Sequence, residues 1–384
     1  MATTSAQQFL VTTLVDGLTI SSDGFTTPSD IFTTSLDTFT TSTDNVTASR
    51  ASDGEDAEVP EFTPKTFGEV FVASFKILIG IVGFLGNLTV CVAVAKMRAQ
   101  RNYANNLIVS QAVADLVTSL VLIATTFTEI FPTSPPQNPA MGYLYCVFWH
   151  SRIFMFAMFS ISTFNLVAIS LERYIAVIHP ILYSQNFTGR TAVMFAVTAW
   201  LLAPLMQVIL GFLQFTFTDG ECEFIFLSFA AQATTGVILF LWDFFGPCII
   251  MAFCFTRISI QFSRQAKRVG AAEMSTTTTS TVSTTVQDNA AEGNTDNAPT
   301  KKSGRGRAIT KTLVIVFLVY VICWSPDQFL FLQWNLGGYI DFGGVIHSLV
   351  VIMAMLNSAC NPFIYALRYK KYREAMKALY TCKA

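Results

Sequence analysis

A glutamate, an arginine and a tyrosine follow one another in the middle of an apolar stretch of this chain. Glu172, Arg173 and Tyr174 come directly after a run that ends at Leu171, and the sequence then turns apolar again. Ionisable groups at membrane depth are costly and usually functional. Because adjacent helix positions face each other poorly, an Arg173 held only by Glu172 is free to exchange partners. The triplet indicates an electrostatic switch, and snorkelling at a helix end is the simpler alternative.

The composition places these residues in a membrane protein. Of 384 residues, 52% are hydrophobic and 13% are charged, whereas soluble domains carry roughly 25% charged residues. Crossing a bilayer takes about 20 apolar residues, and seven stretches are long enough. Since lipid cannot satisfy backbone polar groups, we expect an all-α bundle of seven transmembrane helices. The expected spans are 70–95, 106–131, 143–171, 191–215, 227–256, 308–333 and 343–367.

The positions of the basic residues set the expected orientation. Lysine and arginine collect in short cytoplasmic loops, and here they gather around 96–101, 264–268, 301–311 and 368–373. Acidic residues instead precede the first span and follow the fourth. We therefore expect a multi-pass plasma-membrane protein with an extracellular N-terminus and a cytoplasmic C-terminus. The net charge of −1 gives no support to nucleic-acid binding.

The segments outside the spans have their own compositions. The N-terminal segment is rich in serine and threonine, and Asn45 begins an N-glycosylation acceptor. Cys382 follows an amphipathic stretch and is a palmitoylation candidate, with a free thiol as the alternative. The expected organisation is a disordered extracellular tail over 1–65, helices one to five over 66–268, a disordered third intracellular loop over 269–304, helices six and seven over 305–368, and an amphipathic eighth helix with a short tail over 369–384.

The eight cysteines divide by depth. Those within spans are explained as small buried apolar side chains. Of the others, only Cys146 and Cys222 face the side expected to be oxidising. We expect them to form a disulfide that ties the top of the third helix to the loop after the fourth.

One short motif lies on each of the seven expected spans. The motifs are Gly86-Asn87 in the first span, Ala114-Asp115-Leu116 in the second, Glu172-Arg173-Tyr174 in the third, Trp200 in the fourth, Pro247 in the fifth, Cys323-Trp324-Ser325-Pro326 in the sixth and Asn361-Pro362-Phe363-Ile364-Tyr365 in the seventh. Each motif alone is weak, but in this order and on these spans they resemble the motifs of rhodopsin-like (class A) G-protein-coupled receptors, and the resemblance covers residues 66–382.

The resemblance implies a receptor that activates a heterotrimeric G protein, with arrestin and receptor kinases as further partners. Arg173 would hold Glu172 at rest and enter the G-protein cavity on activation, with Tyr365 of the Asn361-Pro362 motif in support. Trp324 would sense the ligand. Asp115, Ser162, Asn357 and Ser358 match the family's sodium pocket, and a lone carboxylate in mid-bilayer needs a cation or a proton.

This sequence also departs from the family pattern. The acid that usually pins the triplet's arginine is replaced by Arg305-Gly306-Arg307, so we expect a loosely held resting state with Thr310 as a substitute partner and with ligand-free activity. Phe255 stands where a tyrosine is common, and Tyr320 replaces a usual phenylalanine. Cys146 lies two residues further from the triplet than the family spacing, so the top of the third helix is expected to begin differently.

The ligand must be inferred from the remaining polar residues. Met155 stands where an amine receptor would carry an aspartate, so amine binding in that mode is not expected. The span 343–367 has no lysine for a retinal Schiff base, which excludes retinal. Asp243 and Asp327 are both placed near pocket-facing sides of their helices. We expect a cationic ligand, a peptide with a basic residue, anchored by these two acids.

The rest of the expected pocket comes from the outer half of the bundle. Arg152 and His347 are the only basic groups placed there, so the cavity is expected to be net acidic. The alternative for Asp243 is pairing with Arg152 or with a water molecule. The full set of expected pocket residues is Glu129, Arg152, Met155, Asp243, Trp324, Asp327, Gln328 and His347.

Other classes of protein fit less well. The alternative receptor ligands are a small amine or a lipid. A seven-helix transporter would be expected to show internal repeats and broken helices, and none is visible. An enzyme would need a catalytic constellation, but His150, His179 and His347 lie on different elements. We expect no enzymatic activity and no cofactor other than the sodium ion.

Overall fold

Seven long apolar helical segments dominate the described part of the chain. The computed structural model describes residues 67–96, 103–279, 298–341, 344–368 and 372–374. Seven segments within these ranges are long and apolar enough to cross a membrane. The predicted seven-helix membrane fold is therefore confirmed. The spans are Phe67–Lys96, Asn105–Ile130, Ile153–Ile178, Gly189–Gln214, Phe229–Arg268, Thr310–Asn335 and Val345–Arg368.

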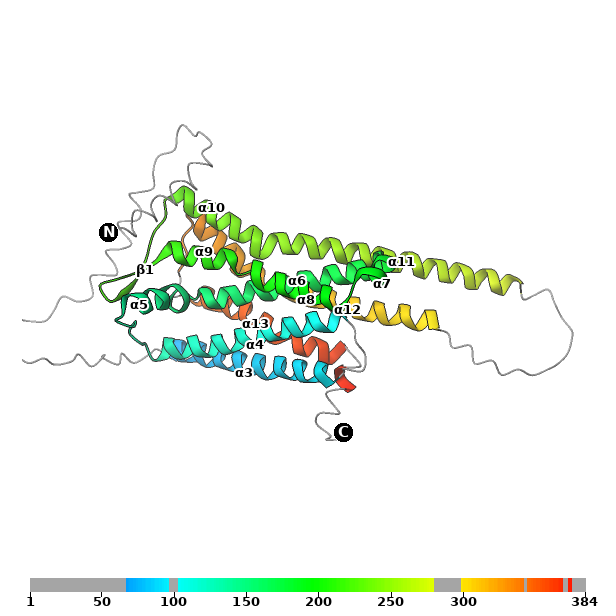
Figure 1. Cartoon of the computed structure of the whole chain (residues 1–384), viewed down its shortest axis with the longest axis horizontal. Coiled ribbons are helices and arrows are strands. Elements are labelled where there is room, and N and C mark those ends of the chain that lie inside the picture. The colour runs from blue at the N-terminus through cyan, green and yellow to red at the C-terminus, as the bar shows by residue number, and fades with distance from the viewer. Residues whose placement is uncertain (1–66, 97–102, 280–297, 342–343, 369–371, 375–384) are drawn as a thin grey trace, which may run out of the picture. The chain divides into compact units, whose positions relative to one another are not determined.

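The helices pack side by side along a common direction (Figure 1). Helix α3 contacts α4 and α13, α4 contacts α6, α6 contacts α11, and α12 contacts α13. The elements are α3 (Phe67–Lys96), α4 (Tyr103–Ile130), α5 (Pro139–Tyr145), the π-helix η1 (Cys146–His150), α6 (Ile153–Ile178), α7 (Pro180–Asn186), α8 (Gly189–Leu202), α9 (Leu205–Gln214), β1 (Phe215–Thr218), β2 (Glu221–Phe224), α10 (Phe229–Phe240), the π-helix η2 (Leu241–Phe245), α11 (Gly246–Thr279), α12 (Ala298–Asn335) and α13 (Val345–Arg368).

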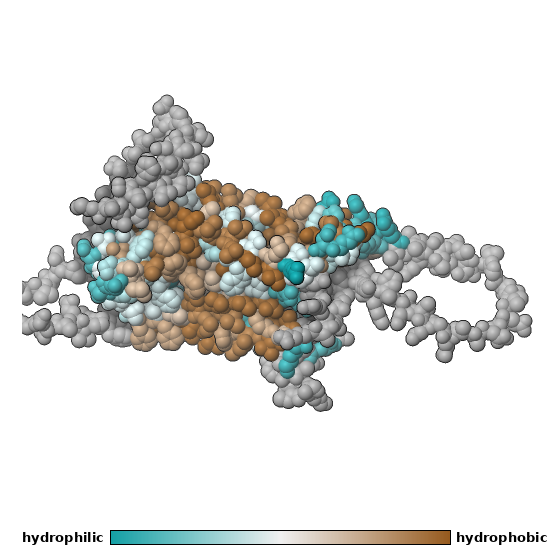
Figure 2. Space-filling model, viewed as in Figure 1, coloured by the Kyte–Doolittle hydropathy of each residue, from teal (hydrophilic) through white to brown (hydrophobic). Residues whose placement is uncertain are grey.

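The outward surface of these helices is apolar. Figure 2 shows hydrophobic side chains spread over the middle of the visible face, with hydrophilic residues gathered toward its two ends. Many large apolar side chains on this surface are exposed, among them Leu78, Phe253 and Ile322. A soluble domain rarely exposes contiguous apolar patches of more than a few hundred square ångströms. The surface fits a hydrocarbon environment.

The continuous helix of the third span, α6, begins later and ends later than the expected range 143–171. The elements α5 and η1 precede it, and Arg152 then takes a left-handed backbone conformation with φ of 61°. The hydroxyl of Ser151 accepts a hydrogen bond from the amide of Ile153 at 3.1 Å, where α6 starts. At the other end α6 continues to Ile178. The break fits the longer spacing of Cys146 from the triplet, and Glu172 and Arg173 lie within the helix instead of at its end.

Prolines interrupt the fourth and fifth spans. Pro204 separates α8 from α9. In the fifth span, Pro247 is the second residue of α11, which follows the π-helix η2. Proline has no amide hydrogen and its ring displaces the carbonyl four residues earlier. The carbonyl of Asp243 is therefore left without its usual helical partner.

A small antiparallel hairpin adds β-structure that the all-α prediction did not include. Strands β1 and β2 pair with Phe217 opposite Cys222. Asp219 and Gly220 join them with φ angles of 53° and 90°. An Asp-Gly pair between alternating residues is a strong hairpin signal, because the turn requires two positive φ angles. The all-α prediction was incomplete because it gave this local signal no weight beside the long apolar spans.

The segment expected to be a disordered loop, 269–304, differs from that expectation at both edges. Helix α11 extends to Thr279 and α12 begins at Ala298. Adding a residue to an existing helix needs no new nucleation, so long spans readily continue beyond their apolar part. Residues 280–297 lie outside the described part of the chain, as do the tail 1–65 with Asn45 and Cys382. Of the expected eighth helix, only residues 372–374 are described, and they are helical.

Candidate functional site

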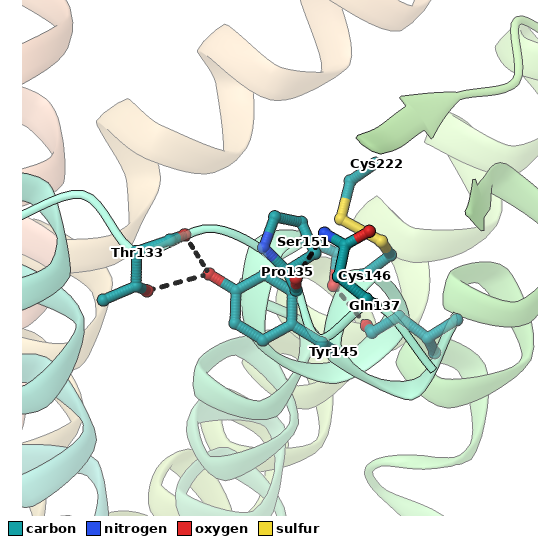
Figure 3. Close-up of a disulfide and its surroundings, with 8 residues drawn as sticks. Thr133, Pro135, Gln137, Tyr145, Cys146, Ser151 and Cys222 are labelled. Carbon is teal, nitrogen blue, oxygen red and sulfur yellow. Dashed lines mark hydrogen bonds between the residues drawn. A yellow bond between two sulfur atoms is a disulfide. The ribbon is translucent and has the colours of Figure 1, made fainter. Parts of the chain in front are cut away.

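The disulfide between Cys146 and Cys222 marks one end of the bundle, which we call the disulfide end. It joins η1 to β2, as the sequence predicted. Figure 3 shows the bond beside the segment that carries Thr133 and Pro135. The hydroxyl of Tyr145 donates to the backbone carbonyl of Thr133 at 3.3 Å. The hairpin, η1 and the segment after α4 are thus connected around one covalent link.

Removing this disulfide is expected to destabilise the disulfide end. Cys146 and Cys222 are 76 residues apart in sequence. Deleting a native disulfide costs about 2 to 5 kcal/mol. The double variant Cys146→Ser/Cys222→Ser should show a clear fall in the thermal unfolding midpoint of the detergent-solubilised protein. Cys248→Ser, which changes a free cysteine, is the matched control and should unfold close to wild type. Equal midpoints for the two would contradict this prediction.

A cavity of about 460 Å³ opens at the disulfide end. Arg152 lines it and pairs with Glu129, with 2.9 Å between Nη2 and Oε1. Glu129 also binds Lys76, whose Nζ lies 3.1 Å from Oε2. Burial lowers the pKa of His150, and the charge of Arg152 lowers it further, so the neutral imidazole is favoured. The lining residues are Thr128, Pro132, Thr133, Pro135, Tyr145, Trp149, His150, Arg152, Glu221 and Cys222.

The outer half of the bundle contains one more basic residue, Lys76, than the sequence analysis assigned to it. The expectation that Arg152 and His347 are the only basic groups in the outer half of the bundle is wrong, because Lys76 of the first span also binds Glu129. Because Glu129 is shared by two cations, it is an ion-pair partner and adds no negative potential of its own. The expected net acidity therefore depends on the acids outside this cluster, which are Asp243, Asp327 and Glu221.

A second and smaller cavity surrounds Asp243. The cavity has a volume of about 20 Å³, which is room for a single water. Ser160 donates its hydroxyl to Oδ1 of Asp243, and Gln207 donates Nε2 to Oδ2 at 2.7 Å. Arg152 pairs with Glu129, so the pairing with Arg152 considered for Asp243 does not occur. The cavity is lined by Phe156, Phe159, Ser160, Thr163, Gln207, Asp243, Trp324 and Gln328; we call it the Asp243 cavity.

Trp324 forms one wall of the Asp243 cavity. Its ring meets that of Phe159 edge-on, with 4.9 Å between centroids. The indole Nε1 is buried and has no hydrogen-bond acceptor among the described residues. A buried donor without a partner is costly, so it is a natural contact for a ligand oxygen. The cavity thus combines one carboxylate, one indole donor and aromatic surface.

The structure brings together only part of the expected pocket. Asp243, Trp324 and Gln328 meet at the Asp243 cavity, whereas Glu129 and Arg152 belong to the larger cavity at the disulfide end. Asp327 accepts a hydrogen bond from Gln328 at 3.3 Å and lines neither cavity. Met155 is buried in the apolar core, and His347 lies in the first turn of α13.

Ser160, Thr163 and Gln207 are pocket residues that were not predicted from the sequence. All three are polar positions inside apolar spans. Polar side chains at such positions face the bundle interior, which was the signal that could have found them.

Tyr320 donates a hydrogen bond to the backbone carbonyl that Pro247 deprives of its helical donor. The hydroxyl of Tyr320 donates to the backbone oxygen of Asp243 at 2.8 Å, and Tyr320 is fully buried. The same logic applies in α13, where Pro362 frees the carbonyl of Ser358 and Asn87 donates Nδ2 to it at 3.0 Å. The departure noted at Tyr320 therefore has a structural reason.

A third polar site lies around Asp115, which is completely buried. Ser162 donates to its Oδ1 at 2.8 Å, and Asn361 donates Nδ2 to its Oδ2 at 2.9 Å. Gln111, which was not expected here, donates Nε2 to the same Oδ2 at 3.1 Å and to the hydroxyl of Ser162 at 2.5 Å.

The residues at Asp115 do not fit a sodium ion as they stand. Sodium binds oxygen atoms, and the buried oxygens of Asn357 and Ser358 have no hydrogen-bond partner among the described residues. However, the N–H groups of Gln111 and Asn361 point at Oδ2 of the carboxylate, and N–H groups repel a cation. Sodium binding stays a prediction, and no functional step is assigned to it.

The Glu172–Arg173 pair lies near the opposite end of the bundle, which we call the Arg173 end. Glu172 is fully buried and Arg173 is 8% exposed. Arg173 binds Glu172 through two nitrogens, Nε and Nη2, which contact both carboxylate oxygens. Adjacent residues thus form a two-point ion pair, contrary to the weak contact expected from helix geometry. The hydroxyl of Tyr183 in α7 also donates a hydrogen bond to Oε1 of Glu172 at 2.5 Å.

Removing the hydroxyl of Tyr183 is expected to raise ligand-free activity. A hydrogen bond to a charged group contributes about 1.5 to 3 kcal/mol, so its loss can shift a two-state equilibrium by about tenfold or more. Tyr183→Phe should increase ligand-free nucleotide exchange at matched surface expression. Ser184→Ala, which changes an exposed neighbour on α7, is the control. Basal exchange equal to wild type would show that Tyr183 does not hold the resting state.

The other switch residues lie at the Arg173 end as well. Thr310 and Tyr365 are buried, and the ring of Phe255 packs against Phe317 with 5.8 Å between centroids. The rings of Tyr365 and Tyr372 meet edge-on, with 6.5 Å between their centroids. The expected roles of Thr310, Tyr365 and the Asn361-Pro362 motif stay predictions.

The seven membrane-length helices of the described ranges, with a disulfide at one end and a buried ion pair near the other, define a polytopic membrane protein. Residues 86–365 match the model of the family described as 7 transmembrane receptor (rhodopsin family). The match covers most of the chain, and the protein belongs to this family. It is accordingly a rhodopsin-like G-protein-coupled receptor and not an enzyme.

Several proteins named after amine ligands are among its relatives. The octopamine receptor beta-2R of Chilo suppressalis is 28% identical over 320 residues, covering 80% of this chain and 78% of the relative. The histamine H2 receptor of Rattus norvegicus is 27% identical, covering 79% and 77%. The GQ-coupled rhodopsin of Mizuhopecten yessoensis is 27% identical, covering 78% of this chain and 57% of that protein.

Proposed function

We propose that this receptor responds to an extracellular ligand with a positively charged group that binds the carboxylate of Asp243. The observation that carries the proposal is the set of partners of Asp243. Its carboxylate accepts hydrogen bonds from two neutral side chains, Ser160 and Gln207. Among the residues that the structure describes, no basic residue lines the Asp243 cavity. A buried carboxylate of this kind attracts a cation strongly, because its surroundings are poorly polarisable.

Two sizes of cationic ligand fit this proposal. The predicted ligand is a peptide with a basic residue, and the 460 Å³ cavity at the disulfide end has the volume to hold more than a small amine. The relatives named after octopamine and histamine favour a small amine, of which only the charged group would enter the Asp243 cavity. Because Met155 replaces the third-helix aspartate, an amine would bind here through the fifth span. Retinal stays excluded, since α13 contains no lysine.

The proposal includes the orientation and the partners. The disulfide end is extracellular, since disulfides persist in oxidising compartments, and the Arg173 end is cytoplasmic. There the receptor activates a heterotrimeric G protein, and arrestin and receptor kinases act on the same side. An extracellular N-terminus with a glycan on Asn45, and a lipidated Cys382, complete the expected picture.

A ligand screen tests the proposal. Cells that express the receptor are exposed to biogenic amines, short basic peptides and lipids, and G-protein activation is measured against untransfected cells. We expect activation by amines or basic peptides. Activation by uncharged lipids alone would contradict a cationic ligand, and transport of a substrate without G-protein activation would contradict a receptor.

A further inference from the structure

Gln111 places an amide directly against the carboxylate of Asp115. It lies on α4 one helical turn before Asp115 and is fully buried. Its amide nitrogen donates to two acceptors, Oδ2 of Asp115 and the hydroxyl of Ser162. Both hydrogens of this amide therefore point into the space between the carboxylate and α6.

The lone pairs of Asp115 are largely used by these donors. A carboxylate has four acceptor positions, two on each oxygen. Oδ2 accepts from Gln111 and Asn361, and Oδ1 accepts from Ser162. A cation at this carboxylate would have to displace an N–H group, because the positive end of an amide dipole already faces Oδ2. The hydrogen bonds also stabilise the carboxylate in the absence of any ion.

The amide of Gln111 has to point this way in the observed arrangement. Turning it over would place its oxygen against Oδ2 of Asp115, which is repulsive unless a cation separates the two. As observed, the oxygen Oε1 is buried without a hydrogen-bond donor among the described residues. The two hydrogen bonds donated by Nε2 stabilise this orientation by more than the unsatisfied Oε1 destabilises it.

We propose that Gln111 is a built-in substitute for a cation, so that this receptor holds Asp115 without sodium. The amide ties α4 to α6 through Ser162, while Asn361 ties the same carboxylate to α13. Replacing Gln111 by an apolar residue opens a cation site formed by Asp115, Ser162 and the buried side-chain oxygens of Asn357 and Ser358. The receptor is then converted from sodium-insensitive to sodium-sensitive.

Thermal unfolding in sodium chloride or choline chloride of equal ionic strength tests the proposal on the purified full-length receptor. Wild type should show the same midpoint in both salts. Gln111→Leu should unfold about 2 to 4 °C higher in sodium than in choline, the shift expected for a site several-fold above its dissociation constant. Gln111→Ala is a second variant with more space. The double variant Gln111→Leu/Asp115→Asn should lose the difference.

Three results would overturn the proposal. A sodium-specific shift in wild type that Asp115→Asn abolishes would show that the cation binds despite Gln111, with the amide turned over. The absence of any sodium-specific shift in both Gln111 variants would show that Gln111 is not what excludes the ion. A shift that survives Asp115→Asn in the double variant would place the ion elsewhere.

Discussion

Arg173→Leu is expected to abolish stimulation of nucleotide exchange on the G protein. Arg173 is the cation of the buried pair with Glu172, and leucine can neither hold Glu172 nor reach a docked partner. We expect exchange to fall at least about tenfold, to the level of membranes without receptor, which corresponds to about 1.4 kcal/mol or more of lost stabilisation. The measurement is binding of a non-hydrolysable GTP analogue at matched receptor density.

Glu172→Gln is the matched variant for this prediction. It removes the other charge of the same pair and releases Arg173, so basal exchange should rise instead of fall. Because breaking a buried ion pair costs about 3 to 5 kcal/mol, thermal unfolding must show that both variants remain folded. If Arg173→Leu exchanged nucleotide like wild type, or if both variants changed it in the same direction, the switch would be refuted.

Asp243→Asn is expected to give the largest loss of agonist potency among single substitutions in the bundle interior. The amide keeps the shape of the carboxylate and can still accept from Ser160 or Gln207, but it has no charge for the ligand. Truncating one partner of a buried charge pair costs about 2 to 5 kcal/mol, so potency should fall about 30-fold to 1000-fold or more.

Two control variants separate the effect of the Asp243 charge from the effects of neighbouring groups. Ser160→Ala removes one donor to Asp243 and keeps the charge, so potency should fall less than in Asp243→Asn. Asp327→Asn removes an acid that lines neither described cavity, and we expect a smaller effect than that of Asp243→Asn. If neither aspartate substitution altered potency, the acidic anchor would be wrong.

Apolar length and motif order were sufficient to predict the fold. The seven spans and the disulfide both followed from one sequence, since these features depend on local composition and on short motifs. The breaks within the spans were harder to predict from the sequence. The left-handed Arg152 and the π-helix before Pro247 depend on which carbonyls and amides find partners across the bundle, and Tyr320 supplies one of them.

The pocket was predictable only in part, because pairing between spans is not visible in a sequence. Lys76 and Arg152 neutralise Glu129, and Gln207 reaches Asp243 from the fourth span. Gln111 showed the clearest available signal, a polar residue four positions before Asp115. That spacing places both side chains on one face of the helix.

A charge-exchange cycle establishes whether the cationic group of the ligand binds Asp243. Nucleotide exchange is measured for an active amine and for its analogue with a hydroxyl in place of the amine, each on wild type and on Asp243→Asn. We expect the loss of the amine to cost about 100-fold in potency on wild type and almost nothing on Asp243→Asn. The same loss on both receptors would mean that the cation binds elsewhere.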